Sequence, residues 1–403
     1  MRDGLAPAVI AVGVAGGLVG AAYVAALHGL QHLLGPGEHR GLVQLAILVA
    51  AGAAVALITR LAGETVDVEL LVDNIHVLGG AEDARRLRSL IPASLLCVAS
   101  GGAMGPEAPL VQSTGTLGTW VGTRFGRPRP DVRILTITGM AAGFTVLFGA
   151  PLGSALFALE ILHRRGLQYY EALLPAVVGS LCGYGVYLAL SGAGIEPVWS
   201  FGPVGTLHGG DLALAAAVGV AGALGAAIFT LVVVAARRVL RPVPRSARYI
   251  VGGLVLGLLG LWSPYALTFG EDQLGGLLDV RLAAGALAVA LVAKLAGTTI
   301  TLASGWKGGF IIPLFFMGAT LGQLVHHALP GTNETLLMAT MMVALCVGVP
   351  KPPLGTTLVV TEMAGLPLLP VTLIAAIVAL VLSRPVTLIE TQRARHPEPR
   401  TAA

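Results

Sequence analysis

Charged side chains are scarce throughout this sequence. Only 11% of the 403 residues are Asp, Glu, Lys or Arg, whereas a soluble domain carries roughly 25%. The hydrophobic content of 55% and the mean hydropathy of +0.83 agree with this deficit. The composition therefore excludes an ordinary soluble protein and predicts an integral membrane protein.

Cysteine and aromatic residues are also few. The three cysteines, Cys97, Cys182 and Cys346, lie in apolar runs without metal-ligand spacing, so we expect buried thiols, no disulfide and no metal site. We expect no cofactor. Aromatic residues make up 5% of the chain. The net charge of +4 reflects basic loops, which in a membrane protein predicts no nucleic-acid partner.

Glycine and proline are abundant, with 55 and 24 residues, and they interrupt the apolar segments. A helix needs about 20 apolar residues to span a bilayer, and a proline inside a helical pattern ends or kinks the helix. Segment 134–159 is broken near Pro151, and segment 335–361 is broken near Pro350. We therefore expect an all-α fold with many tilted, discontinuous helices. The uncharged runs are 8–27, 42–59, 108–123, 134–159, 172–195, 212–236, 249–270 and 308–333.

One carboxylate is isolated in the glycine-rich stretch GGAMGPEAPLVQSTGTLG at 101–118. No charged residue lies between Arg88 and Glu107, or between Glu107 and Arg124. An ionisable group in so apolar a segment is costly and is functional by default. The alternative is a glutamate at a helix start, neutralised by the helix dipole and by local N–H groups. We expect Glu107 to be functional.

The same pattern returns later in the chain. Residues 304–322 read SGWKGGFIIPLFFMGATLG and match 101–118 at an offset of 204, while APLGSALFALE at 150–160 matches PPLGTTLVVTE at 352–362 at an offset of 202. Duplicated halves with broken hydrophobic segments in corresponding positions are typical of transporters and channels.

The duplication predicts two inverted repeats, approximately 90–200 and 290–390. We expect them to meet near Glu107 and Ile311, within one membrane transport domain that covers 1–403 and lacks a soluble domain.

The distribution of arginine predicts the orientation. Five arginines and no acid occur in 237–248, and the tail after Leu382 is also basic. Basic loops stay on the cytoplasmic side. No cleavable signal is evident, so we expect a multi-pass protein of the cell (inner or plasma) membrane with both termini in the cytoplasm.

Four motifs resemble the CLC family of chloride channels and proton–chloride antiporters. GPEAP at 105–109 is similar to the G(K/R)EGP signature, and GGFIIP at 308–313 is similar to the GxFxP signature. TGMAAGFTVLFGAPLGSALFALE at 138–160 is similar to the segment that follows the family's gate. SRPV at 383–386 lies where the family begins its last helix.

This resemblance implies a CLC-like inverted-repeat fold and a transporter or channel for chloride or a similar small anion, rather than an enzyme. It implies that Glu107 is a protonatable gate and that two copies form a homodimer with one pathway each. The partners are therefore the anion, protons and the lipid bilayer. The anion-binding positions that it implies are Asp73, Gly105, Pro106, Ala108, Gly309, Phe310, Ile311 and Thr387.

The match departs from the family at several positions. Asp73, within VDNIH, stands where the family's GSGIP signature has a serine, and Thr387 replaces the tyrosine of the last helix. Pro106 and Ala108 replace the residues on either side of the gate. Ile161 replaces the internal proton-transfer glutamate of the antiporters, which leaves both a channel and an antiporter open.

The chemistry of an anion path does not require a fixed positive charge. A helix N-terminus presents unpaired N–H groups and roughly half a positive charge, and the glycines before Glu107 and Phe310 allow an ion to approach the backbone. Lys307 either raises anion affinity or extends to an interface. We expect Lys294 to pair with a carboxylate such as Glu160 or Glu362.

Two other functions remain as alternatives. A transporter with the same fold would use Asp73 and Glu107 for a different ion or solute. An intramembrane hydrolase would use Ser100 or Ser304 as nucleophile and His76 as base, which requires the two groups to lie within hydrogen-bond reach.

Overall fold

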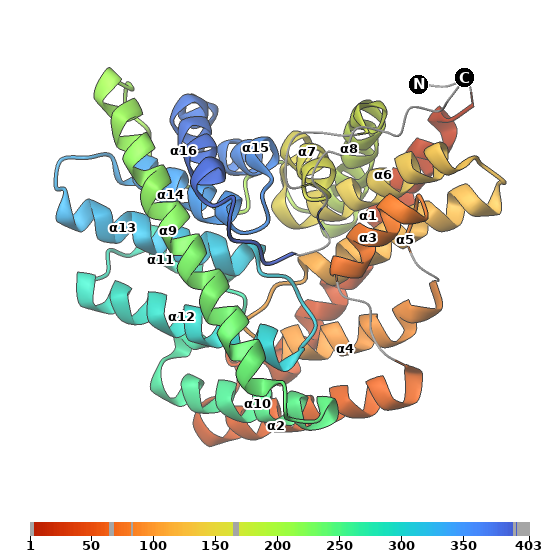
Figure 1. Ribbon diagram of the computed structural model, residues 1–403, viewed down its shortest axis with the longest axis horizontal. Helices are drawn as coiled ribbons and strands as arrows, with labels where there is room; N and C mark the ends of the chain where they lie inside the picture. Colours follow the sequence, from red (N-terminus) through yellow and green to blue (C-terminus); the bar gives the residue numbers. More distant parts are fainter. Residues whose placement is uncertain (1–3, 64–67, 82–83, 164–168, 390–391, 393–403) are drawn as a thin grey trace.

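The computed structural model describes residues 4–63, 68–81, 84–163, 169–389 and 392 (Figure 1). In these residues the fold consists of sixteen α-helices and four short 3-10 helices, without a β-strand. Seven of the described helices are long and apolar enough to cross a membrane. The expectation of an all-α membrane fold is confirmed.

The helices form two groups of eight. In Figure 1 the first group, in warm colours, lies mainly on the right, and the second group, in green and blue, lies mainly on the left. The first group comprises α1 (Ala6–Leu34), α2 (Gly41–Ala62), α3 (Val68–Val77), α4 (Leu87–Ala99), α5 (Glu107–Arg124), α6 (Arg129–Phe148), α7 (Pro151–Glu160) and α8 (Leu173–Ser191). The second comprises α9 (Gly209–Leu240), α10 (Arg245–Trp262), α11 (Glu271–Asp279), α12 (Ala284–Ser304), α13 (Ile311–Ala328), α14 (Glu334–Gly348), α15 (Pro353–Ala364) and α16 (Leu369–Leu382).

The succession of helices is the same in the two groups. Helices α5 and α13 each have 18 residues and begin at Glu107 and Ile311, 311 − 107 = 204 positions apart. The correspondence also includes α1–α3 and α9–α11, which lie outside the expected halves. Their lengths agree closely: 29 against 32 residues, 22 against 18, and 10 against 9. The duplication therefore extends each expected half on its N-terminal side, from 90 back to Ala6 in the first and from 290 back to Gly209 in the second.

The predicted helix breaks are present at both related positions. Helix α6 ends at Phe148, Gly149 follows it with a left-handed φ of +61°, and α7 begins at Pro151. In the second repeat α14 ends at Gly348 and α15 begins at Pro353. Proline is tolerated in the first turn of a helix because no intrahelical partner exists there for its missing N–H. The breaks therefore place two short helices, α7 and α15, in contact with each other.

Small residues allow the long helices to pack closely. A Cβ at Gly118 in α5 would overlap the Leu135 carbonyl of α6, and a Cβ at Gly318 in α13 would lie 2.5 Å from the Cα of Met342 in α14. Association in lipid depends on such close packing. Both repeats thus use glycine to bring the helix that follows the central turn against its neighbour.

Candidate functional site

The two glycine-rich turns meet directly. The N–H of Gly105 donates to the carbonyl of Gly309 at 2.8 Å, and the N–H of Gly309 donates to the carbonyl of Gly105 at 2.6 Å. The pair forms an isolated antiparallel bridge, so the two related turns run in opposite directions. The two related turns therefore join at this bridge, as the expected meeting of the repeats near Glu107 and Ile311 requires.

Glu107 crosses from one repeat to the other. It is the first residue of α5, its exposed fraction is 0%, and its Oε1 accepts a hydrogen bond of 2.6 Å from the backbone N–H of Ile312 in the first turn of α13. The alternative interpretation, a glutamate neutralised only by the helix that it begins, does not account for this bond to the other repeat. The carboxylate lies at the positive end of α13, the place that a bound anion would take.

Glycine is required beside this carboxylate. A Cβ at Gly105 would overlap the Glu107 side chain, and a Cβ at Gly309 would lie 2.5 Å from its Oε2. Both turns therefore need bare backbone to accommodate a carboxylate or an anion of similar size. Oε2 is buried, and within the described part of the chain it has no hydrogen-bond partner. A carboxylate with one oxygen bonded and one not is held less firmly than one with both oxygens satisfied.

Most of the predicted anion-binding residues surround this point. Pro106 precedes α5, Ala108 follows Glu107 in its first turn, and Phe310 and Ile311 open α13. The bridge of Gly105 and Gly309 joins the two sets, so the structure brings six of the eight predicted positions together. The six are Gly105, Pro106, Ala108, Gly309, Phe310 and Ile311.

Asp73 and Thr387 are placed differently. Asp73 is the sixth residue of α3. Only the first four N–H groups of a helix lack an intrahelical partner, so the backbone at Asp73 offers no free donor. Thr387 follows α16 and is partly buried, and Leu388 and Ile389 beside it line a cavity. Their roles in anion binding stay predictions.

Glu160 and Glu362 form a second cross-repeat arrangement. Glu160, the last residue of α7, accepts from the N–H of Gly355 in α15 at 2.6 Å, and Glu362 of α15 accepts from the N–H of Gly153 in α7 at 2.5 Å. Each short helix is therefore capped at its N-terminus by a carboxylate from the other. This reciprocity again requires antiparallel, symmetry-related helices.

Lys294 does not pair with either of these carboxylates, contrary to the prediction. Its Nζ donates to the carbonyls of Leu267 and Thr268, at 2.8 Å each, and lies 5.1 Å from the centre of the Phe316 ring. The reason is that the N-termini of α7 and α15 already engage the two glutamates. The lysine instead fixes the turn that precedes α11.

The reciprocal caps lead to a matched pair of predictions. Glu160→Ala and Glu362→Ala are each expected to lower the free energy of unfolding by about 1–2 kcal/mol, the range for loss of a helix cap. The double variant is expected to lose close to the sum, because each glutamate caps a different helix. Thermal unfolding in one detergent tests this, with the exposed Glu196→Ala as control. Midpoints equal to that of the control would contradict the capping role.

The hydrolase alternative lacks its nucleophile–base pair. His76 Nδ1 is 2.9 Å from the hydroxyl of Tyr169, and its Nε2 is 2.8 Å from the carbonyl of Leu162. Ser100 and Ser304 instead donate to carbonyls within their own helix turns, those of Cys97 and Thr301. Both nitrogens of the candidate base are engaged away from either serine, so the arrangement required for covalent catalysis is not formed.

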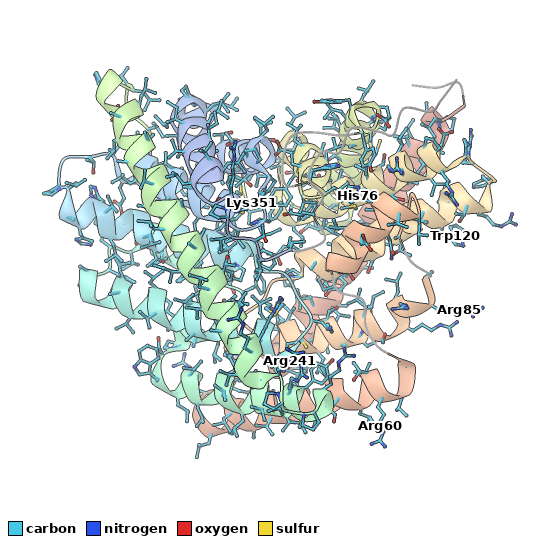
Figure 2. All side chains as sticks on the ribbon, in the orientation of Figure 1. Arg60, His76, Arg85, Trp120, Arg241 and Lys351 are labelled. Carbon is cyan, nitrogen blue, oxygen red and sulfur yellow. The ribbon has the colours of Figure 1, made fainter. Side chains whose placement is uncertain are left out.

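Buried cations were the features that the sequence analysis assigned least well. Lys351 is 4% exposed, and its Nζ donates to the carbonyl of Gly348 and to both the carbonyl and the hydroxyl of Ser383. Figure 2 shows Lys351 and His76 in the upper part of the view, and Arg241 and Arg60 in the lower part, where α2 packs on α10. The sequence feature that could have indicated this role is the position of Lys351 in the break between α14 and α15, where helix-end carbonyls need donors.

The comparisons with known proteins agree with this geometry. A family model described as "Voltage gated chloride channel" matches residues 74–384. The chain belongs to this family. Members of this CLC family are channels or transporters and not enzymes, and this chain is a multi-pass membrane protein.

Two bacterial relatives show how far the similarity extends. The "Chloride/fluoride channel protein" of Pseudomonas syringae pv. tomato is 28% identical over 370 residues, covering 87% of this chain and 78% of the relative. The "Voltage-gated ClC-type chloride channel ClcB" of Escherichia coli O157:H7 is 30% identical over 301 residues, covering 72% and 71%.

Solved structures share the fold at low identity. A slow cyanobacterial Cl⁻/H⁺ antiporter superposes with a TM-score of 0.81 at 20% identity and covers 95% of each chain. A CLC-type fluoride/proton antiporter superposes with a TM-score of 0.81 at 22% identity and covers 97% of this chain and 98% of its own. The expectation of a CLC-like inverted-repeat fold is thereby confirmed.

Proposed function

We propose that this protein carries a small inorganic anion, with chloride as the first candidate, across the cell membrane, and that Glu107 is its protonatable gate. The observation that carries the proposal is the hydrogen bond from the N–H of Ile312 to the Glu107 carboxylate. An anion at the start of α13 would need that same donor. The gate and the transported ion therefore compete for one place.

Protonation is the step that opens the path in this mechanism. A neutral carboxyl no longer competes for the positive end of α13. The Glu107 side chain can then move away from α13, and an anion can accept a hydrogen bond from the N–H of Ile312. Backbone dipoles provide attraction without a fixed charge at the site itself. Binding stays weak enough for the ion to continue, as conduction requires.

The residue at position 161, an isoleucine, favours one of two mechanisms. It favours anion conduction gated by protons, and not a strictly coupled exchange of protons for anions. It is 5% exposed, and its carbonyl accepts from Nε2 of Gln392 at 2.8 Å. Its side chain carries no titratable group at the position where the antiporters have an internal glutamate. A proton that leaves Glu107 toward the inner side thus has no carboxylate relay at this position.

Assembly and orientation complete the proposal. Helices α8 and α16 carry exposed apolar side chains, among them Leu181 at 52% and Ile377 at 50%, and we propose that two copies meet at these helices as a homodimer. We place the arginine-rich segment 237–248 and both termini on the cytoplasmic side, in keeping with the bias of basic residues in short loops.

Chloride efflux from proteoliposomes tests the proposal. Vesicles loaded with potassium chloride are expected to release chloride, followed with a chloride electrode, when valinomycin allows potassium to leave with it. Empty vesicles and vesicles with heat-inactivated protein are the controls. Efflux no faster than in the controls would overturn the proposal. Flux of a different ion alone would favour the alternative of a transporter with the same fold and another solute.

A further inference from the structure

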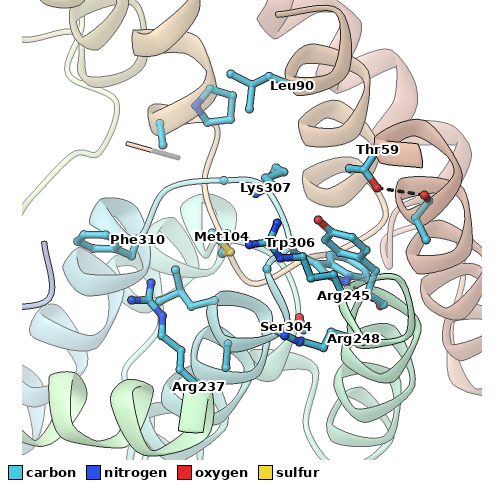
Figure 3. Close-up of a pocket in the computed structure, with 18 of the residues that line it drawn as sticks. Thr59, Leu90, Met104, Arg237, Arg245, Arg248, Ser304, Trp306, Lys307 and Phe310 are labelled. Carbon is cyan, nitrogen blue, oxygen red and sulfur yellow. Dashed lines mark hydrogen bonds between the residues drawn. The ribbon is translucent and has the colours of Figure 1, made fainter. Parts of the chain in front are cut away.

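A small cavity lies at the end of α13 that is remote from the central turns. The large cavity drawn in Figure 3 opens on Met104 and Phe310 of those turns and is part of the candidate site. The small cavity has a volume of about 160 Å³ and is formed by the last turns of α13, the first residue of α14 and the loop between α11 and α12. Helices α11, α12 and α14 all pack on α13 (Figure 1). At 1.5 Å per residue, the cavity lies roughly 20 Å along α13 from its start at Ile311.

Gln323 lines this cavity with one polar atom unsatisfied. Its exposed fraction is 3%, and its Nε2 donates to the Leu277 carbonyl in the last turn of α11 at 2.8 Å and to Oε1 of Glu334 at 3.0 Å. These two acceptors fix the orientation of the amide, because the reverse orientation would place Oε1 against both of them. Within the described residues Oε1 has no hydrogen-bond partner. A buried acceptor without a partner costs free energy, which favours a ligand at this point.

His326 presents a second acceptor. The Thr332 hydroxyl donates to the Leu329 carbonyl at 2.8 Å, so it accepts from Nδ1 of His326, 3.4 Å away. These contacts assign the proton of the neutral imidazole to Nδ1 and the lone pair to Nε2. Nε2 lies 4.0 Å from Oε2 of Glu334. An imidazole lone pair and a carboxylate oxygen thus lie close together, an arrangement that a bound cation stabilises.

The spacing of these acceptors suits a divalent transition metal. Imidazole and carboxylate groups bind zinc at about 2.0–2.2 Å, so two ligand atoms of one ion lie roughly 3.4 Å apart at a tetrahedral angle and at most about 4.3 Å apart. The separation of 4.0 Å between His326 and Glu334 falls within this span. The volume of the cavity leaves room for two or three waters beside the ion, at about 30 Å³ each.

Arg281 is the counter-charge that a metal would replace. Its guanidinium lies 3.6 Å from Oε2 of Glu334, and its side chain is 83% exposed. An ion pair with so exposed a partner contributes little to stability. The arginine can therefore turn into water at small cost when the carboxylate binds a metal.

We propose that this cavity binds a divalent transition metal ion of the zinc class. The ligands are Nε2 of His326, the carboxylate of Glu334 and Oε1 of Gln323, with water in the remaining positions. No group of three or more His, Cys, Asp or Glu side chains that could hold a metal occurs in the described part of the chain, and the third protein ligand here is an amide. Imidazole selects such ions over magnesium and calcium, which prefer oxygen ligands. The bound ion joins α13 to α14 away from the central turns, so its binding does not depend on the transport function.

Titration calorimetry with zinc chloride tests the site, on tag-free protein in nanodiscs of neutral phosphatidylcholine. The wild type is expected to bind zinc and not to bind magnesium at the same concentration. His326→Ala and Glu334→Gln are each expected to weaken zinc binding at least about tenfold, since even loss of an outer-shell partner costs roughly 10–100-fold. Helix α14 keeps its cap in Glu334→Gln, because Asn333 accepts from the N–H of Leu336. Arg281→Gln is expected to strengthen zinc binding severalfold, because it removes the competing cation.

His28→Ala is the matched control. His28 is an exposed residue of α1, one helical turn from His32, and such a pair is the alternative place for zinc on the surface. Absence of zinc binding in the wild type, equal affinity for magnesium, or a loss of binding in His28→Ala but not in His326→Ala would overturn the proposal. Thermal unfolding gives a second readout: zinc is expected to raise the midpoint of the wild type and of Arg281→Gln, but not that of His326→Ala. If His326→Ala does not fold, Arg281→Gln decides, and an affinity no higher than that of the wild type would contradict the site.

Discussion

Glu107→Gln is expected to conduct chloride at least as fast as the wild type and to lose the dependence of that flux on external pH. Glutamine preserves the size of the side chain but carries no negative charge. It therefore cannot compete with chloride for the N–H of Ile312 as the carboxylate does. In the wild type, flux is expected to rise as the external pH falls, because protonation removes the competing charge.

The measurement is chloride efflux from proteoliposomes over a series of external pH values, wild type beside variant. Glu196→Gln, which alters an exposed glutamate in the segment after α8, is the matched control and should keep the wild-type pH profile. A variant profile that runs parallel to the wild type would remove Glu107 from the gate. The transport function would survive that result, since the efflux itself would remain.

Lys351→Met is expected to lower the free energy of unfolding by about 3 kcal/mol, the scale of one to two hydrogen bonds to a charged group. The ammonium joins the end of α14, through the Gly348 carbonyl, to the end of α16, through Ser383. Methionine fills a similar volume but leaves the Gly348 carbonyl without the ammonium donor, while the Ser383 carbonyl keeps only the N–H of Val386. An unpaired buried acceptor incurs the desolvation penalty that the lysine offsets.

A graded partner variant makes this prediction sharper. Ser383→Ala removes one hydroxyl acceptor and keeps both carbonyls, so it is expected to cost only about 1 kcal/mol. Unfolding midpoints in the same detergent give the comparison. A Lys351→Met protein as stable as Ser383→Ala would show that the ammonium does not hold the two helix ends together.

The sequence by itself determined the class of the protein and the positions of its helix breaks. Scarcity of charge requires a membrane environment, because so apolar a chain cannot maintain a water-exposed surface. Proline and glycine near 149–151 and 350–353 end helices through local backbone geometry, so no distant contact is needed to predict them. The duplication was visible for the same reason: each repeat carries its own local pattern. Glu107 was recognisable because no other charge is near it in the chain.

Only the tertiary structure decided what these residues contact. Glu107 bonds to Ile312, 205 positions away, and Glu160 bonds to Gly355, 195 positions away. Lys294 was predicted to pair with a carboxylate and instead donates to two carbonyls. Periodicity and composition report the neighbours of a residue along the chain, whereas antiparallel docking of two repeats creates neighbours across it. The arginines of 237–248 indicated orientation from sequence, and only the folded chain shows three of them around one cavity.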